Sequence, residues 1–152
     1  MPNRRSSAAA SLLALVLAAC GGSSEEAPPP ATPAPQPAAD HYTGHWRGLA
    51  DITSTVPDAP SEMGVEATIV QGGGQCGTFE YGSIACSGVW MCTSSYDAPT
   101  MRIEERVRYG NERCPDGARV ELSPTDEPDQ LLFRYTGPQI QATGTLERVQ
   151  TR

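Results

Sequence analysis

The chain has 152 residues and carries 18 acidic against 11 basic side chains, which gives a formal net charge of −7. An acidic protein lacks the basic surface that phosphate groups require, so the charge argues against nucleic acid as a partner. It also argues against electrostatic attachment to an anionic membrane surface. The part of the chain from residue 40 to residue 152 is enough for one domain and too short for two.

The N-terminus has the pattern of an export signal. Two arginines precede the apolar run 8–19, which is too short to span a membrane and has the length of a signal-peptide core. The run ends in Leu17-Ala18-Ala19-Cys20. This ending resembles the lipobox of bacterial lipoproteins. The resemblance implies that residues 1–19 are a signal peptide and that Cys20 becomes the lipid-modified first residue, with acyl chains such as palmitate.

Acyl chains on Cys20 would hold the protein at the cell envelope, because two or three chains anchor far more firmly than one. The glycine at position 21 implies, by the same resemblance, export to the outer membrane if the host is diderm. The domain would then be extracytoplasmic. The alternative is an ordinary secretory signal that happens to end before a cysteine.

Residues 20–39 join the lipidated cysteine to the domain. Six of them are proline and none is a large apolar residue. Such a stretch cannot offset the entropy lost on ordering, so we expect a disordered, semi-stiff spacer. A Pro-x-x-Pro ligand, as in 30–33, is the alternative.

From residue 40 onward no segment has sustained helical periodicity, and short β-rich runs recur between Gly, Pro, Asp and Asn. Connections of hairpin length favour an all-β domain built as a small antiparallel eight-stranded up-and-down β-barrel, because closure removes exposed strand edges. An open β-sandwich is the alternative. The expected strands are Tyr42–Thr53, Met63–Gln71, Gly77–Tyr81, Cys86–Ser94, Thr100–Tyr109, Ala118–Ser123, Gln130–Thr136 and Ile140–Val149.

Alternation along the fifth expected strand places Glu105 on the inner face. A buried carboxylate must be paired, hydrogen-bonded or protonated. We therefore expect an ion pair with Arg148 or Arg119, or else a contact with a ligand inside the barrel. The inner face of this strand comprises Met101, Ile103, Glu105, Val107 and Tyr109. The outer face carries Arg102, Arg106 and Arg108, a basic stripe that we interpret as solvated, with docking of an anionic partner as the alternative.

The sequence Gly44-His45-Trp46 opens the first expected strand, and Arg148 lies near the end of the last. This arrangement resembles lipocalin-like and avidin-like (calycin) β-barrels, in which a basic residue of the last strand packs on the tryptophan of a Gly-x-Trp motif. The resemblance implies a lipocalin-like barrel with Arg148 over Trp46. A cation over a desolvated indole contributes about 1 kcal/mol or more.

Four cysteines remain in the domain if Cys20 is lipidated, and an even number in an exported domain predicts two disulfide bonds. Cys86 and Cys92 lie on one extended strand about 20 Å apart, so they cannot bond each other. A hairpin of the third and fourth strands would bring Cys76 near Cys92. We therefore favour Cys76–Cys92 with Cys86–Cys114 over Cys76–Cys86 with Cys92–Cys114. The spacings match no zinc pattern.

No set of residues adds up to a catalytic site. The two histidines, His41 and His45, would lie on one face of a strand but about 13 Å apart, which is too far to share a metal, so we expect a surface pair. No serine lies in the G-x-S-x-G motif. We therefore expect no catalytic activity, no metal and no cofactor.

These features favour a small binding module that holds a small-molecule ligand or contacts an envelope protein, with Glu105, Trp46 and Arg148 as candidate ligand-binding or polar core residues. The alternative is a structural or interaction lipoprotein whose barrel is solid. An enzyme is the least favoured class, and a polar cleft that unites both histidines with a carboxylate would revive it.

Overall fold

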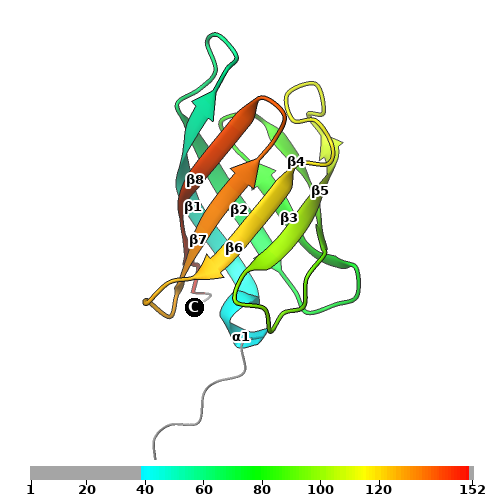
Figure 1. Cartoon of the computed structure of the whole chain (residues 1–152), viewed down its shortest axis with the longest axis vertical. Helices are drawn as coiled ribbons and strands as arrows, with labels where there is room; N and C mark the ends of the chain where they lie inside the picture. The colour runs from blue at the N-terminus through cyan, green and yellow to red at the C-terminus, as the bar shows by residue number, and fades with distance from the viewer. Residues whose placement is uncertain (1–38, 151–152) are drawn as a thin grey trace, which may run out of the picture. The chain divides into compact units, whose positions relative to one another are not determined.

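The computed structural model describes residues 39–150, so the expected signal peptide, the lipidated Cys20 and nearly all of the tether lie outside the described residues. Eight strands form a closed antiparallel barrel in which each strand pairs with its sequence neighbours and β1 pairs with β8 (Figure 1). The predicted up-and-down barrel is confirmed, and the open sandwich is wrong. The strands are β1 (Gly44–Ser54), β2 (Glu62–Ile69), β3 (Gln75–Tyr81), β4 (Cys86–Cys92), β5 (Met101–Tyr109), β6 (Arg119–Pro124), β7 (Gln130–Thr136) and β8 (Ile140–Arg148).

A helical turn, α1 (Ala39–Tyr42), precedes β1, where the sequence predicts that a strand already begins at Tyr42. Tyr42 is buried, and its hydroxyl donates to the carbonyl oxygen of Ala98 at 2.9 Å. Its own carbonyl oxygen accepts from Trp46 Nε1 at 2.8 Å. These tertiary contacts override the local β pattern. His41 therefore lies in α1 and His45 in β1, so the two do not share one strand as expected. Within residues 39–150, no helix has the length and apolar character needed to cross a membrane.

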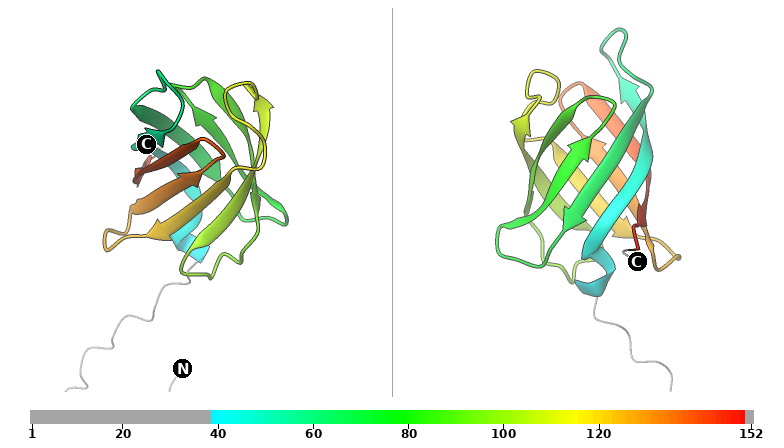
Figure 2. Two further views of the ribbon diagram at one scale, coloured as in Figure 1. Left: turned by 45° about the horizontal axis from the view of Figure 1, so that its top comes forward. Right: turned by 180° about the vertical axis from the view of Figure 1, so that it is seen from behind.

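Strand alternation gives the barrel two ends (Figures 1 and 2). The β2–β3, β4–β5 and β6–β7 connections lie with α1 at one end, which we call the α1 end. The other four connections lie at the opposite end, which we call the far end. The described chain therefore enters the barrel at the α1 end.

Glycines allow the first and last strands to approach closely. A Cβ on Gly144 would overlap the carbonyl oxygen of Leu49, and one on Gly48 would overlap that of Thr145. Gly in a strand interior marks a tight bend of this kind in a small barrel. The seam between β1 and β8 thus depends on residues that lack a side chain.

A register shift between Ser87 and Gly88 corrects the predicted inner face of β5. Gly88 pairs with Val107 and Ser87 with Tyr109, so one residue of β5 is left over as in a bulge. Beyond that point the alternation is lost, and Tyr109 is 70% exposed although the sequence places it inside.

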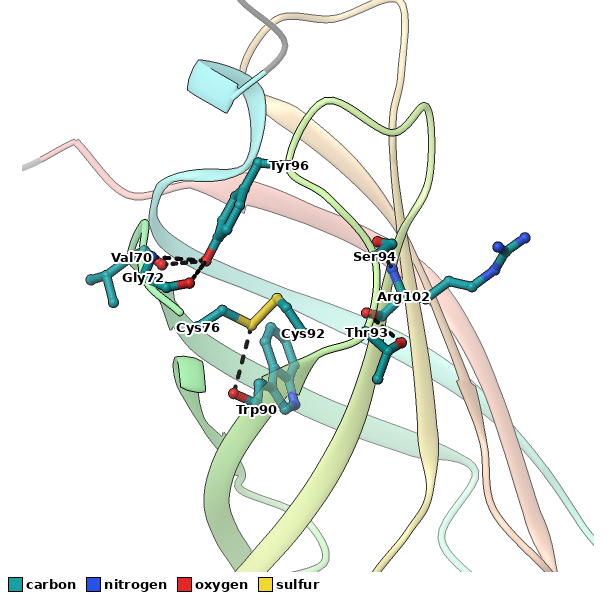
Figure 3. Close-up of a disulfide and its surroundings, with 9 residues drawn as sticks. All are labelled: Val70, Gly72, Cys76, Trp90, Cys92, Thr93, Ser94, Tyr96 and Arg102. Atoms are coloured by element: carbon teal, nitrogen blue, oxygen red, sulfur yellow. Dashed lines mark hydrogen bonds between the residues drawn. A yellow bond between two sulfur atoms is a disulfide. The ribbon is translucent and has the colours of Figure 1, made fainter. Parts of the chain in front are cut away.

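Two disulfide bonds fasten the barrel, and both follow the favoured pairing. Cys76–Cys92 joins β3 to β4 at the α1 end, and Cys86–Cys114 joins β4 to the β5–β6 connection at the far end. Figure 3 shows Tyr96, beside the first disulfide, reaching across to the β2–β3 connection. Its hydroxyl donates to the carbonyl oxygen of Val70 at 2.7 Å and accepts from the Gly72 backbone N–H at 3.3 Å. The connections at the α1 end are therefore cross-linked by covalent and polar contacts.

Candidate functional site

The barrel interior contains one carboxyl group among the described residues, that of Glu105, which is fully buried. It projects from the middle of β5 toward side chains of β3 and β4. The hydroxyl of Tyr81 and Nε1 of Trp90 both donate to Oε1 of Glu105, the latter at 3.0 Å. Oε2 has no hydrogen-bond partner among the described residues. The predicted inward position of Glu105 agrees with the structure.

Burial dominates the electrostatics of this group. Loss of solvent raises the pKa of Glu105 to about 7, although the hydrogen bonds from Tyr81 and Trp90 oppose the rise. Burial and the nearby Glu105 carboxylate likewise raise the pKa of Tyr135 to about 12, and they raise the pKa of Tyr81 well above its ordinary value. A neutral carboxylic acid therefore occupies the interior over much of the acidic pH range.

The predicted ion pair of Glu105 is wrong. Arg119 is exposed on β6, and Arg148 lies at the α1 end. There Arg148 Nε donates to Asp129 at 3.0 Å, and the guanidinium also donates to the carbonyl oxygens of Thr43 and His41. These contacts hold Arg148 between α1 and the β6–β7 connection, away from Glu105, so the interior carboxyl group accepts hydrogen bonds from neutral donors only.

The expected packing of Arg148 on Trp46 is confirmed, since the guanidinium carbon lies 4.3 Å from the centroid of the indole. Trp46 is fully buried, and its Nε1 is already bonded to the backbone of Tyr42. Together these groups close the α1 end. Trp46 and Arg148 therefore close the barrel beneath the helical turn, and Trp46 lines none of the described hollows.

Side chains fill the space between the barrel walls. Glu105 lines none of the hollows described for residues 41–150, and these hollows open to solvent. Interior-facing positions of small barrels are commonly filled in this way. The twelve largest side chains with less than 2% exposure are Trp46, Trp90, Tyr42, Tyr81, Phe133, Met63, Ile69, Met101, Ile103, Leu122, Leu131 and Leu146.

A hollow of about 850 Å³ lies on the outer side of the wall formed by β8, β1, β2 and the end of β3. We call it the outer groove. Leu49 stands in it and is 63% exposed, with Gly64 opposite on β2 and Thr145 opposite on β8. The right-hand view of Figure 2 looks onto the side of the barrel where β1 and β2 run in front. The outer groove is lined by Arg47, Gly48, Leu49, Asp51, Gly64, Val65, Glu66, Glu80, Gly82, Gly144, Thr145, Glu147, Arg148 and Val149.

Carboxylates form two rows on either side of Leu49. In one row Asp51 of β1 stands directly opposite Glu62 of β2. In the other row Glu66 of β2 stands directly opposite Glu80 of β3, and Glu147 of β8 stands opposite Arg47. Like charges directly opposite each other on neighbouring strands are destabilising. The sequence shows these residues, but their alignment depends on strand register.

One histidine and several arginines on the outer surface are paired with acidic neighbours. His45 Nε2 lies 3.0 Å from Glu66, which Arg47 also approaches at 3.4 Å. In the basic stripe Arg102 pairs with Glu121 at 3.5 Å and Arg106 with Glu104 at 2.7 Å. Within residues 41–150, no group of three or more His, Cys, Asp or Glu side chains is placed so that it could hold a metal ion. The structure thus brings His45 beside a carboxylate but does not unite it with His41 in one cleft.

Comparisons with family models, with curated proteins and with solved structures find no match to this chain. The geometry of the barrel and the pattern of its N-terminus therefore carry the functional argument.

Proposed function

We propose that this protein is a lipid-anchored cell-envelope lipoprotein whose solid barrel serves as a protein-interaction module without enzymatic activity. The observation that carries the proposal is the filled interior, in which Trp46, Trp90, Phe133 and Leu146 have less than 2% exposure. A barrel packed in this way presents its outer wall and its connections to a partner, not its lumen. The lipobox-like ending at Cys20 and the Pro-rich tether support display of such a barrel at a membrane.

Closure of the α1 end adds to this argument. Tyr42 is buried there, the Trp46 indole donates to its carbonyl oxygen, and the Arg148 guanidinium covers the Trp46 ring. A ligand that entered from this end would have to displace all three groups. The outer wall, by contrast, offers an exposed leucine in a hollow with an acidic rim.

Two measurements test the interaction module. Titration of the full-length protein with a library of hydrophobic ligands, followed by tryptophan fluorescence, is expected to leave the emission of Trp46 and Trp90 unchanged. Photoreactive amino acids placed at outward positions on several strands are expected to cross-link the protein to another envelope protein in living cells. Absence of cross-links from every outward position would contradict the proposal.

A second candidate function, binding of a small molecule inside the barrel, rests on Oε2 of Glu105. Oε2 of Glu105 is buried without a partner among the described residues, and an unsatisfied buried oxygen of this kind is costly. A small molecule that donates a hydrogen bond inside the barrel would satisfy it. A ligand that shifts the Trp90 emission in the wild type but not in Glu105→Gln would favour this candidate over a solid barrel.

A further inference from the structure

We propose that the outer groove is the docking site for a basic segment of a partner protein, in which an apolar side chain lies between cationic ones. The inference rests on the proposed function as an interaction module and names the surface and the chemistry of its partner. It draws on three independent features of the wall: an exposed leucine, a hollow beside it, and charge that the fold itself leaves uncompensated.

The apolar feature is Leu49, which lines the groove. Leu49 is 63% exposed and stands between Gly64 and Thr145 on the two neighbouring strands. A Cβ on Gly64 would meet nothing within 4 Å, so open space lies beside the leucine. The fold does not bury Leu49, and a partner side chain placed over Gly64 would remove its surface from water.

The charged feature is the pair of acidic rows. Asp51 faces Glu62, and Glu66 faces Glu80, so two pairs of like charges stand directly opposite each other. Glu66 forms an ion pair with Arg47 and a hydrogen bond with His45. No ion pair within residues 41–150 involves Asp51, Glu62, Glu80 or Glu147. Repulsion of this kind weakens the pairing of the strands, and a cationic partner relieves it.

Register sets the pattern that a partner must present. The acidic rows pass through Arg47 and Asp51, which lie two residues before and two residues after Leu49 on the same face of β1. The rows are therefore about 13 Å apart. An extended segment with the sequence pattern cation–x–apolar–x–cation has the same period and places one cation at each row. The apolar residue then falls beside Leu49.

Synthetic peptides test the chemistry on the purified full-length protein. The probe is a fluorescent extended peptide with the core Arg-Thr-Leu-Thr-Arg, compared with Arg-Thr-Ser-Thr-Arg and Glu-Thr-Leu-Thr-Glu cores by anisotropy. We expect the first to bind with an affinity that falls as salt is added, and the other two to bind at least about tenfold more weakly. Equal binding of all three cores, or no binding of the first, would overturn the inference.

Variants locate the binding. Leu49→Ser and the double variant Glu62→Gln with Glu80→Gln are each expected to weaken the Arg-Thr-Leu-Thr-Arg peptide about tenfold, which is the size of a strong single contact. Val70→Ser is the matched apolar control, since Val70 is 50% exposed and lies at the α1 end outside the groove. Glu112→Gln, in the exposed β5–β6 connection, is the matched acidic control. Controls that weaken binding as much as the groove variants would overturn the inference.

Cross-linking in cells separates this inference from the proposed function. A photoreactive residue at Thr145, which is exposed in the groove, is compared with one at Arg134, which is exposed on β7. Cross-links from Thr145 to an Arg- or Lys-rich segment of another protein support both proposals. Cross-links from Arg134 alone, or from Thr145 to a second copy of this chain, overturn the groove while the interaction module stands. Absence of cross-links from both positions and from the other outward positions overturns both.

Discussion

Glu105 has surroundings that make its protonation state part of the energetics of folding. Its carboxyl group accepts two hydrogen bonds from neutral donors, Tyr81 and Trp90, and has no cation beside it. Donors of this kind offset only part of the cost of moving a charge out of water. Ionisation of Glu105 therefore lowers the free energy of unfolding whenever the solution is basic enough to remove the proton.

The sign of the resulting pH dependence follows from the raised pKa. The pKa of Glu105 rises from an ordinary 4.5 to about 7, so the folded state binds the proton more tightly than the unfolded state. Its contribution to stability is fully present below pH 4.5 and is lost as the pH rises through 7. A shift of this size corresponds to about 3 kcal/mol in total.

Urea denaturation between pH 4 and pH 8 measures this effect. The wild-type unfolding free energy should fall by about 3 kcal/mol across that range from this group. Glu105→Gln cannot ionise and should remove this part of the slope. Glu112→Gln, at an exposed position, is the control and should keep the slope. A slope in Glu105→Gln as steep as in the wild type would show that another group is responsible.

Among the elements, the seam of β1 and β8 depends on glycine. A Cβ at Gly144 would overlap backbone atoms of β1, and backbone cannot move aside as a side chain can. Gly64, in β2, has the same residue type in the same kind of element, but nothing lies within 4 Å of its Cβ position. The two glycines therefore form a matched pair.

Gly144→Val should lower the unfolding free energy by at least about 3 kcal/mol, because the strands must separate to admit the side chain. Gly64→Val should change stability by no more than about 0.5 kcal/mol, or raise it slightly, since valine favours strands and the position is open. Thermal denaturation by circular dichroism checks both. Similar losses in the two variants would argue against a close approach at the seam.

The sequence was enough to predict these elements where the pattern is local. All eight expected strands differ from the observed ones by no more than two residues at either end, because alternation and turn residues mark them. The start of β1 was predicted two residues early, since the contacts of Tyr42 with Ala98 and Trp46 come from distant parts of the fold. Tyr109 was misplaced because a bulge leaves no sequence mark at the strand it affects.

The candidate site likewise combines a feature that the pattern of one strand predicts with features that depend on pairing between strands. The inward position of Glu105 follows from alternation along one strand, so the sequence predicts it. Its donors Tyr81 and Trp90 come from two other strands, and only the register of β3, β4 and β5 brings them together. The outer groove likewise needs the alignment of Leu49 with Gly64 across strands.

At the scale of the whole molecule, the proposed anchor makes a direct prediction. Cys20→Ala should abolish incorporation of labelled palmitate and move the protein from the membrane fraction to the soluble fraction of the envelope, because acyl chains supply the attachment. Ser24→Ala, a neighbouring change that keeps the cysteine, is the control. Membrane association that survives Cys20→Ala would show that the barrel itself, or a partner, holds the protein there.

Pairing of β1 with β8 brings the two ends of the domain together along Trp46–Ser54 and Ile140–Arg148. Contacts between distant parts of a chain form slowly, and an exported chain emerges with its N-terminus first. The sheet therefore keeps two unpaired edges until its final segment has arrived. A product that stops short of β8 would expose both edges to other chains, and such a product would be prone to aggregation or proteolysis.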